Sequence, residues 1–482
     1  MKKFLFILTS ISLLIFSGCQ EDYLERVPTA SVSESDIFST VNGAYTVLHG
    51  IHRSTFQYYG AHDKFGQKSV DLAVDLLGED FFQSERGYGW FVSWYQYIDH
   101  RNINSANLEY VWEYYYDIVD NANAILANVD KASDAALFAS KVNSLKAQSL
   151  TYRAYSFYQL VQLYADRYDI GGANTHLGIP IPTAPSQEGQ ARATVAKVYE
   201  QINADLDAAL ALFAAGATAR VNKSEININV AKGIKARVAL TTGQWAVAET
   251  MAREARTGFS LSADFCQTDA GGFIDSSDPE WMWGAVLIDE QQTSYASFFS
   301  HIDPYFGGYA ALGNHKLAST EIYNFMSDTD IRKSLFVTVS GKPRVGIKFS
   351  GYGEWTNDYL YMRSGEMYLI EAEAQARQGK AEAQTTIYNL VSKRDPEYVK
   401  PTLTGEDLIQ HILMQRRCEL WGEGQRFFDI KRLNIALDRR GKGHTETLWN
   451  AAGNFPAGDK NLTFLIPKQE IDANPNMVQN PL

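Results

Sequence analysis

The sequence feature that most restricts the fold is the stretch from Arg417 to Arg432, which reads R-C-E-L-W-G-E-G-Q-R-F-F-D-I-K-R. It lies at the end of a predicted helix that begins at Thr404. Thr404 and Asp407, three positions later, have the form of a capping box. Two glycines interrupt this helix, and the apolar pattern resumes at Phe427. Charges interleaved with large apolar groups must pair or cap helix ends if they are buried, because an unpaired buried charge is very costly. The stretch therefore predicts a locked helix–kink–helix joint with a structural rather than a catalytic role.

The C-terminus carries a second motif. Ile466 to Pro481 reads I-P-K-Q-E-I-D-A-N-P-N-M-V-Q-N-P, and the cluster from Asp472 to Asn476 forms a turn that cannot continue a helix. These two motifs, in this order, resemble the C-terminal signature of the SusD/RagB family, nutrient-binding lipoproteins of the Bacteroidetes outer membrane. The resemblance implies tetratricopeptide-like helices on one side of the protein and a variable loop region that holds the ligand.

The composition describes a globular protein with ample core. The chain has 482 residues, of which 45% are hydrophobic and 21% are charged, enough for two to four average domains or one large helical unit. Its net charge of −12 argues against a nucleic-acid or anionic-lipid surface, because both require a basic face. Aromatic residues, at 13%, are in excess, and their faces can stack on flat apolar faces of sugars, peptides or bases.

The N-terminus indicates the compartment. Lys2 and Lys3 precede an apolar segment, Phe4 to Phe16, that is too short to span a bilayer. It ends in I-F-S-G-C, which resembles a bacterial lipobox with Cys19 as the lipidated residue; the alternative is an ordinary signal peptide with a chance cysteine. Several acyl chains on one residue give stable anchoring. The acidic residues directly after Cys19 resemble the tag that sends Bacteroidetes lipoproteins to the outer face.

The chain therefore divides into a lipoprotein signal peptide (residues 1–18), a lipidated tether (19–40) and a single domain (41–482). Beyond Cys19 only Cys266 and Cys418 remain, and the sequence leaves open whether they form a disulfide. No C-x-x-C pair or Cys/His cluster indicates a metal site, and whether a structural cation is bound also stays open. We expect no cofactor.

Helical periodicity dominates the chain. Helices are predicted from Val41 to Arg53, from Leu108 to Val129 and from Leu145 to Tyr164, and helix pairs within 236–255 and 361–394, turning at Gly243 and Gly379. The first of these pairs resembles a tetratricopeptide unit. The pattern lapses mainly within 79–107 and 259–360, and loops this long are usually functional. We predict a mostly α fold, a helical scaffold with an irregular, loop-rich region and little β structure; the run from Trp281 to Ile288 is the candidate strand.

No catalytic constellation is evident. The G-x-S-x-G, H-E-x-x-H and Walker A patterns are absent. A glycosidase needs two carboxylates at a defined separation. The acidic pairs Asp71/Asp75 and Glu371/Glu373 are more simply interpreted as helical surface charge, and His49 with His52 as a helix surface pair. The sequence predicts a protein that is not an enzyme, with no catalytic and no metal-binding residues.

A binding function fits the aromatic residues better. Oligosaccharide capture needs exposed aromatic rings flanked by groups that hydrogen-bond hydroxyls. Glycines around Tyr88 argue for a loop that presents rings outward. The candidate ligand-binding residues are Arg86, Tyr88 and Trp90, with Tyr305 and Trp355 from the middle region. Plain core packing is the alternative for each ring. Trp281, Trp283 and Trp421 are assigned to the core.

The family resemblance also implies a mechanism. Such a protein is a surface-exposed, lipid-anchored lid over a SusC-like TonB-dependent outer-membrane transporter, to which it delivers oligosaccharides. The alternatives are a peptide-binding lid of the RagB type and a surface glycoside hydrolase. The ligand loops vary within the family, so the resemblance does not name the glycan.

Overall fold

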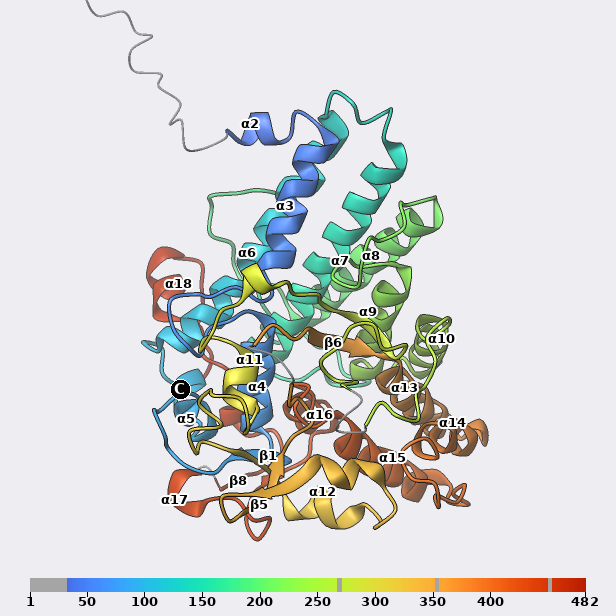
Figure 1. Ribbon diagram of the computed structural model, residues 1–482. Helices are drawn as coiled ribbons and strands as arrows, with labels where there is room; N and C mark the ends of the chain where they lie inside the picture. The colour runs from blue at the N-terminus through green and yellow to red at the C-terminus, as the bar shows by residue number, and fades with distance from the viewer. Residues whose placement is uncertain (1–32, 267–270, 352–354, 450–452) are drawn as a thin grey trace, which may run out of the picture.

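The computed structural model describes residues 33–266, 271–351, 355–449 and 453–482, and helices are its main secondary structure (Figure 1). About 48% is helix and 7% is strand, which confirms the predicted mostly α class. The predicted lipidation site Cys19 and the signal peptide lie outside the described residues. Within the described ranges, no helix has both the length and the apolar character needed to cross a membrane.

The helices follow the chain in a long N-terminal group and a C-terminal group separated by the loop-rich region. The first group contains α2 (Glu34–Ile37), α3 (Val41–Ser54), α4 (Gln67–Leu77), α5 (Val92–Tyr95), α6 (Ala106–Asn128), α7 (Ala139–Tyr164), α8 (Val195–Ala214), α9 (Ile228–Thr241) and α10 (Trp245–Ala255). The others are α11 (Phe298–Ile302), α12 (Thr320–Phe325), α13 (Ser364–Arg377), α14 (Glu382–Val391), α15 (Gly405–Leu420), α16 (Arg426–Leu433), α17 (Glu446–Trp449) and α18 (Lys468–Ala473).

Most of the long helices pack as successive antiparallel neighbours. Helix α7 lies between α6 and α8, α9 packs on α10, and α13 contacts α10, α14 and α15. Gly243 and Gly379 turn the chain between the paired helices at φ +72° and +71°, a backbone conformation that glycine adopts without steric cost. Fully buried alanines such as Ala248 and Ala252 let the helices approach closely. The two predicted helix pairs are confirmed, although the strand β6 occupies the start of the second predicted range.

The strands form three small antiparallel sheets. The largest has the order β1-β3-β5-β4, a second pairs β2 with β6, and a third pairs β7 with β8. Their bounds are β1 (Phe81–Gln83), β2 (Trp281–Ala285), β3 (Lys316–Ala318), β4 (Phe336–Val339), β5 (Lys342–Gly346), β6 (Tyr359–Arg363), β7 (Leu437–Asp438) and β8 (Asn454–Phe455). The candidate strand at Trp281 is confirmed, and the tryptophans assigned to the core are buried.

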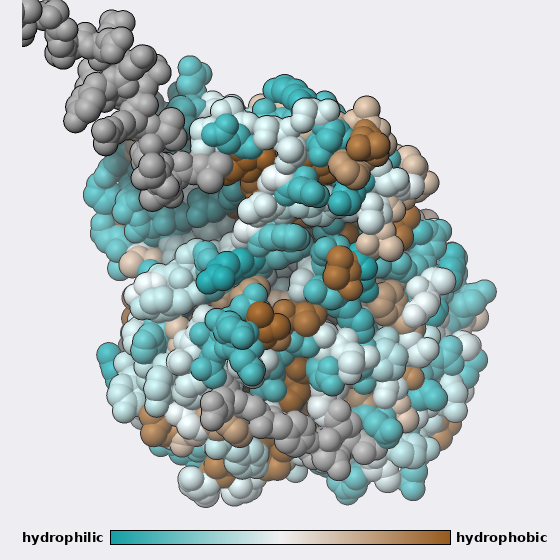
Figure 2. All heavy atoms as spheres, turned by 45° about the horizontal axis from the view of Figure 1, so that its top comes forward, coloured by the Kyte–Doolittle hydropathy of each residue, from teal (hydrophilic) through white to brown (hydrophobic). Residues whose placement is uncertain are grey.

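The surface is mainly hydrophilic on the face that Figure 2 draws. Figure 2 shows hydrophobic side chains in small separate groups between hydrophilic ones on this face. Most of the buried apolar side chains belong to one continuous core, and a second cluster fills the space between α13, α14 and α15.

The helix–kink–helix joint is confirmed. Helices α15 and α16 are separated by Gly422 and Gly424 at φ +77° and +73°. A Cβ added to Gly422 would lie 2.6 Å from the Phe349 ring, so the kink packs too closely for a larger residue. The capping box, in contrast, is wrong. Thr404 precedes the helix, but its side chain makes no cap hydrogen bond, because Gly405 with φ +56° opens the helix instead.

The joint is locked by a buried ion network around Glu419. Its carboxylate oxygens lie 2.6 Å from Arg363 Nη1, 3.0 Å from Arg394 Nη2 and 3.0 Å from Arg332 Nη1. All four side chains are at most 2% exposed. Burial alone would raise the pKa of Glu419, but the three guanidinium groups together hold it well below its usual range. The carboxylate is therefore charged and fully compensated.

Several charges that we predicted on the surface are buried instead. Asp71 and Asp75 lie on α4, every residue of which is buried. Asp75 Oδ2 accepts a hydrogen bond from the amide of Gly424 at 2.9 Å, and Glu373 forms an ion pair with Arg432 at 2.7 Å. The surface interpretation of the acidic pairs was wrong. Asp75, Glu371 and Glu373 have partners far along the chain that local sequence patterns do not reveal, and Asp71 pairs with Lys68 on the same buried helix.

The His49/His52 prediction was also partly wrong. His52 is 8% exposed and packs its ring 5.7 Å from that of Tyr152. Burial lowers the pKa of His52 to about 3, so the ring is neutral. Cys266 and Cys418 are both buried and free, and burial raises the pKa of each thiol to about 12.

We predict that Glu419→Gln lowers the free energy of unfolding by about 3–5 kcal/mol, because it leaves buried guanidinium groups without their shared charge. Glu406 is an exposed glutamate on the same helix, and Glu406→Gln should change stability by less than about 0.5 kcal/mol. Urea denaturation followed by circular dichroism measures both. Equal effects of the two substitutions would contradict a locking role for Glu419.

Candidate functional site

A glycine-containing loop between β1 and α5 carries two aromatic rings to the surface. Gly87 and Gly89 have φ values of +51° and +93°, and the Gly89 amide donates to the carbonyl of Arg86 at 2.9 Å. This left-handed backbone suits glycine. The turn leaves Tyr88 70% exposed, while Trp90 is half-buried. The predicted loop from 79 to 107 is thus shorter than expected, because β1 and α5 lie within it.

Tyr309 joins this loop to a segment more than 200 residues later in the chain. The centroid of its ring lies 5.2 Å from that of Tyr88, 6.0 Å from that of Trp90 and 5.4 Å from that of Tyr295. The Tyr295 ring in turn lies 5.1 Å from that of Trp355. The tilted and edge-to-face arrangements are those that aromatic pairs prefer. We refer to these five residues as the aromatic platform.

His62, in the connection between α3 and α4, supports the platform from a third segment. Its ring stacks on Tyr295 at 6.2 Å and 12°, and Nδ1 shares a hydrogen bond of 2.5 Å with the hydroxyl of Tyr309. Below it, His301 stacks on Tyr309 at 5.0 Å and donates from Nε2 to the His62 carbonyl at 2.8 Å. Burial lowers the pKa of His301 to about 3, so a neutral imidazole supports the platform.

A pocket of about 560 Å³ opens beside the platform and includes Tyr295 and His62 in its lining. The rest of its wall comes from the end of α3 and the connection after it, and from residues 290–296. Arg53, Gln57 and Glu290 offer guanidinium, amide and carboxylate groups, which hydrogen-bond hydroxyls. The site therefore combines flat apolar rings with nearby polar groups, which is what a ligand rich in hydroxyls but with apolar faces requires.

The structure brings three of the five predicted ligand residues together, namely Tyr88, Trp90 and Trp355. Tyr305 is 59% exposed on the segment that also contains Phe306, whose carbonyl accepts a hydrogen bond of 3.0 Å from Trp355 Nε1. Among the described residues, no ring pair joins Tyr305 to the platform. Arg86 is exposed at the turn before Tyr88.

Sequence reasoning missed three residues of this site. Tyr309 falls in the aromatic and glycine-rich stretch 303–313, which was a detectable signal, although the tyrosine itself was not singled out. His62 also lies in an aromatic and glycine-containing stretch, 56–66, and Tyr295 lies close to Phe298 and Phe299, but neither residue was singled out. Their contribution depends on chain topology, which places three distant segments side by side.

In the described part of the chain, no group of three or more His, Cys, Asp or Glu residues could hold a metal ion. Two of the carboxylates considered for hydrolysis, Glu371 and Glu373, are buried in ion pairs with arginines.

Comparisons with known proteins agree with the architecture. Residues 288–482 match the family model described as the SusD family, and residues 51–240 match a model described as "Starch-binding associating with outer membrane". Together these matches cover most of the chain. It belongs to the SusD/RagB family. The resemblance of the C-terminal motifs is thereby confirmed, and the family is one of glycan-binding proteins. The description of the model that matches residues 51–240 mentions association with the outer membrane.

Individual SusD-like proteins are similar over nearly the whole chain. SusD-like protein P2 of Formosa agariphila is 23% identical over 98% of this chain and 97% of its own length. The crystal structure of a SusD-like carbohydrate binding protein from Bacteroides vulgatus has a TM-score of 0.81 at 23% identity, covering 91% of this chain and 97% of that one. Surface glycan-binding protein A from Bacteroides fluxus has a TM-score of 0.69 at 18% identity, covering 94% and 100%. At these identities the solved structures establish the shared fold.

Tyr309 is the centre of the platform, so we predict that Tyr309→Ala lowers the free energy of unfolding by about 3 kcal/mol, as is usual for removal of a buried aromatic side chain. Tyr88→Ala removes an exposed ring and should cost less than about 0.5 kcal/mol. Equilibrium denaturation measures both effects. If Tyr309→Ala left the free energy of unfolding unchanged, the packing of Tyr309 against the other rings would not contribute to stability.

Proposed function

We propose that this protein is a surface-exposed, lipid-anchored binding protein that captures oligosaccharides on the aromatic platform and delivers them to a partner TonB-dependent outer-membrane transporter. The observation that carries the proposal is the convergence of five aromatic rings beside a pocket with guanidinium, amide and carboxylate groups. Membership in a glycan-binding family supports the class of ligand.

The platform offers a sugar two kinds of contact. The apolar C–H faces of pyranose rings can lie against the exposed Tyr88 and the half-buried Trp90 and Trp355. Hydroxyl groups at the edge of the same sugar can reach Arg53 or Glu290 in the adjoining pocket. Because His62 and Tyr309 are hydrogen-bonded to each other, the rings are held before ligand arrives, which reduces the entropy lost on binding.

Anchoring and delivery follow from the chain's ends and its scaffold. Lipidation at Cys19 would hold the protein at the membrane. The last part of the predicted tether is not extended, because it contains helix α2, which packs on α3. The helical scaffold is the surface we propose for docking to the transporter, leaving the loops free for ligand. In this role the protein binds and passes on its ligand without cleaving it.

The proposal is tested with the mature protein lacking Cys19, by affinity electrophoresis in gels that contain soluble polysaccharides. We expect retardation by at least one neutral polysaccharide and at least about tenfold weaker binding by Trp90→Ala, because a stacked ring contributes on the order of 1.4 kcal/mol or more.

Tyr388→Ala is the control, because Tyr388 is also a half-buried aromatic residue but lies on α14, outside the platform and the pocket beside it. It should be retarded like the wild type. Binding that Trp90→Ala leaves intact would overturn the placement of the site. Failure to bind any polysaccharide, together with binding of oligopeptides, would overturn the class of ligand.

A further inference from the structure

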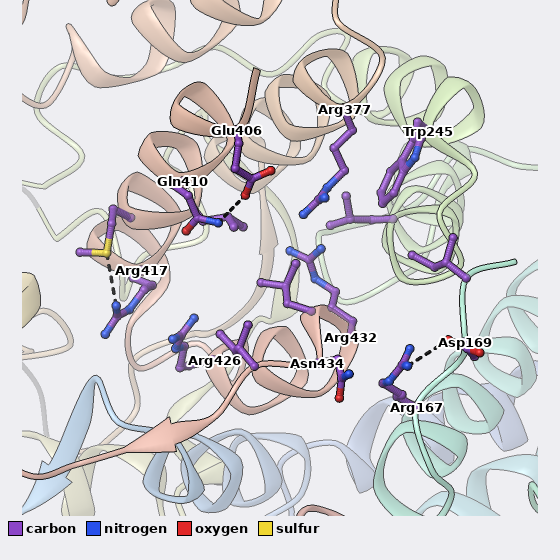
Figure 3. Close-up of a pocket in the computed structure, with 16 residues that line it drawn as sticks. Arg167, Asp169, Trp245, Arg377, Glu406, Gln410, Arg417, Arg426, Arg432 and Asn434 are labelled. Carbon is purple, nitrogen blue, oxygen red and sulfur yellow. Dashed lines mark hydrogen bonds and ion pairs between the residues drawn. The ribbon is translucent and has the colours of Figure 1, made fainter. Parts of the chain in front are cut away.

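A second pocket, of about 460 Å³, lies within the helical scaffold (Figure 3). Its walls come from α9, α10, α13, α15 and α16 and from the connection after α7. It shares no lining residue with the pocket beside the aromatic platform. The proposed function therefore leaves it without a role.

The lining of this pocket is strongly basic in a chain whose net charge is −12. Five arginines line it but only two carboxylates, Asp169 and Glu406. The two carboxylates are engaged at the edges, Asp169 with Arg167 at 2.9 Å and Glu406 with Gln410 at 2.7 Å. We call this site the arginine pocket; its arginines are Arg167, Arg377, Arg417, Arg426 and Arg432.

Arg377 has hydrogen-bond donors, its two terminal nitrogens, that no protein acceptor in the described residues uses. In Figure 3 its side chain points toward Arg432 from the opposite wall. Arg432 is fully engaged, with bonds of 2.7–2.8 Å from its three nitrogens to Glu373 and Asp429. Arg377 donates to Glu373 only from Nε, at 3.0 Å, and its terminal nitrogens have no acceptor within the described residues. Its guanidinium lies 5.0 Å from the ring centroid of Trp245, which holds it in place.

Two further guanidinium groups are incompletely satisfied. Arg417 pairs through Nη2 with Asp80 at 2.5 Å and Glu321 at 2.7 Å, but its Nη1 donates to the thioether sulfur of Met414 at 3.2 Å, a weak acceptor for a charged donor. Arg426 is only 8% exposed; its Nη2 pairs with Glu79 at 2.5 Å, whereas its Nε lies 3.7 Å from the Asp80 carboxylate, too far for a hydrogen bond. Unmade hydrogen bonds of buried charged groups are costly. The pocket thus has three arginines whose hydrogen-bonding capacity exceeds what the protein supplies.

We propose that the arginine pocket binds an oxyanion, a carboxylate, sulfate or phosphate, either as a free anion or as a group of a small organic ligand. A guanidinium fork matches the oxygens of such groups with paired hydrogen bonds. Leu240, Leu413 and Trp245 provide an apolar wall for the uncharged part of the ligand. The volume is within the usual range of small-molecule sites.

The test uses isothermal titration calorimetry of the mature protein lacking Cys19, at an ionic strength held constant with sodium chloride. The probes are sulfate, phosphate and glucuronate, with glucose as the uncharged counterpart of glucuronate. We expect saturable binding of at least one anion, no matching signal from glucose, and at least tenfold weaker anion binding by Arg377→Gln.

Arg253→Gln is the matched control. Arg253, like Arg377, bonds a glutamate one turn earlier on its own helix, but it does not line the pocket. It should bind the anion as the wild type does. Gln410→Glu changes an exposed position that lines the pocket and adds a negative charge there, so it should weaken binding without disturbing the fold.

The outcomes separate the sources of the anion. Preference for glucuronate identifies an acidic sugar, whereas binding of sulfate or phosphate alone identifies a free inorganic anion, and both support the site. Absence of saturable anion binding, or equal binding by Arg377→Gln, would overturn it. Trp90→Ala should leave anion binding unchanged, so failure of this proposal and failure of the glycan proposal are distinguishable.

Discussion

The buried carboxylate of Glu419 is the interaction on which the rest of the structure depends. Its three arginine partners come from the end of β6, from the connection between α14 and α15, and from the turn before β4. One charge therefore ties the helical scaffold to the strands of the loop-rich region. Removing an ion from water is costly, and only close pairing with several donors offsets that cost. The segments that supply Arg332, Arg363 and Arg394 meet at Glu419, and each arginine also pairs with a further carboxylate, from Asp330, Glu423 and Glu280 respectively.

This constraint reaches the aromatic platform through two connections. The kink after Glu419 places the Gly424 amide against Asp75 near the end of α4, and β1 follows α4 directly. Strand β1 ends where the loop with Tyr88 and Trp90 begins. From the other side, Arg332 stands just before β4, which pairs with β5, and β3 joins β5 to β1. The loops can thus differ in sequence while their ends stay fixed, because the ion network lies outside them.

The helical part of this arrangement was predictable, since helix periodicity, small residues and turning glycines are local signals. The pairs turning at Gly243 and Gly379 and the kinked joint followed from them. The burial of Asp75 was not predictable, because its partner Gly424 is 349 residues away. The residues around an acidic side chain do not show from sequence alone whether it is buried. The platform was predictable only in part for the same reason. Tyr88 and Trp90 stand in a conspicuous loop, whereas Tyr295 and His62 become part of a site only through the topology.

The two proposed sites, the aromatic platform and the arginine pocket, rest on different physics, and from this difference we infer a separate role for each. Stacking on Tyr88 and Trp90 depends on apolar contact and is nearly independent of salt, so it suits neutral sugar rings. The arginine pocket acts through guanidinium donors that its own ion pairs leave unused, and salt screens such charged contacts. Its donors lie on the rigid helices that the Glu373 and Asp429 pairs hold together, not on loops. A scaffold that serves only to dock and to support loops has no need for guanidinium groups with free donors. Their presence in a chain of net charge −12 is therefore better explained by a ligand than by packing.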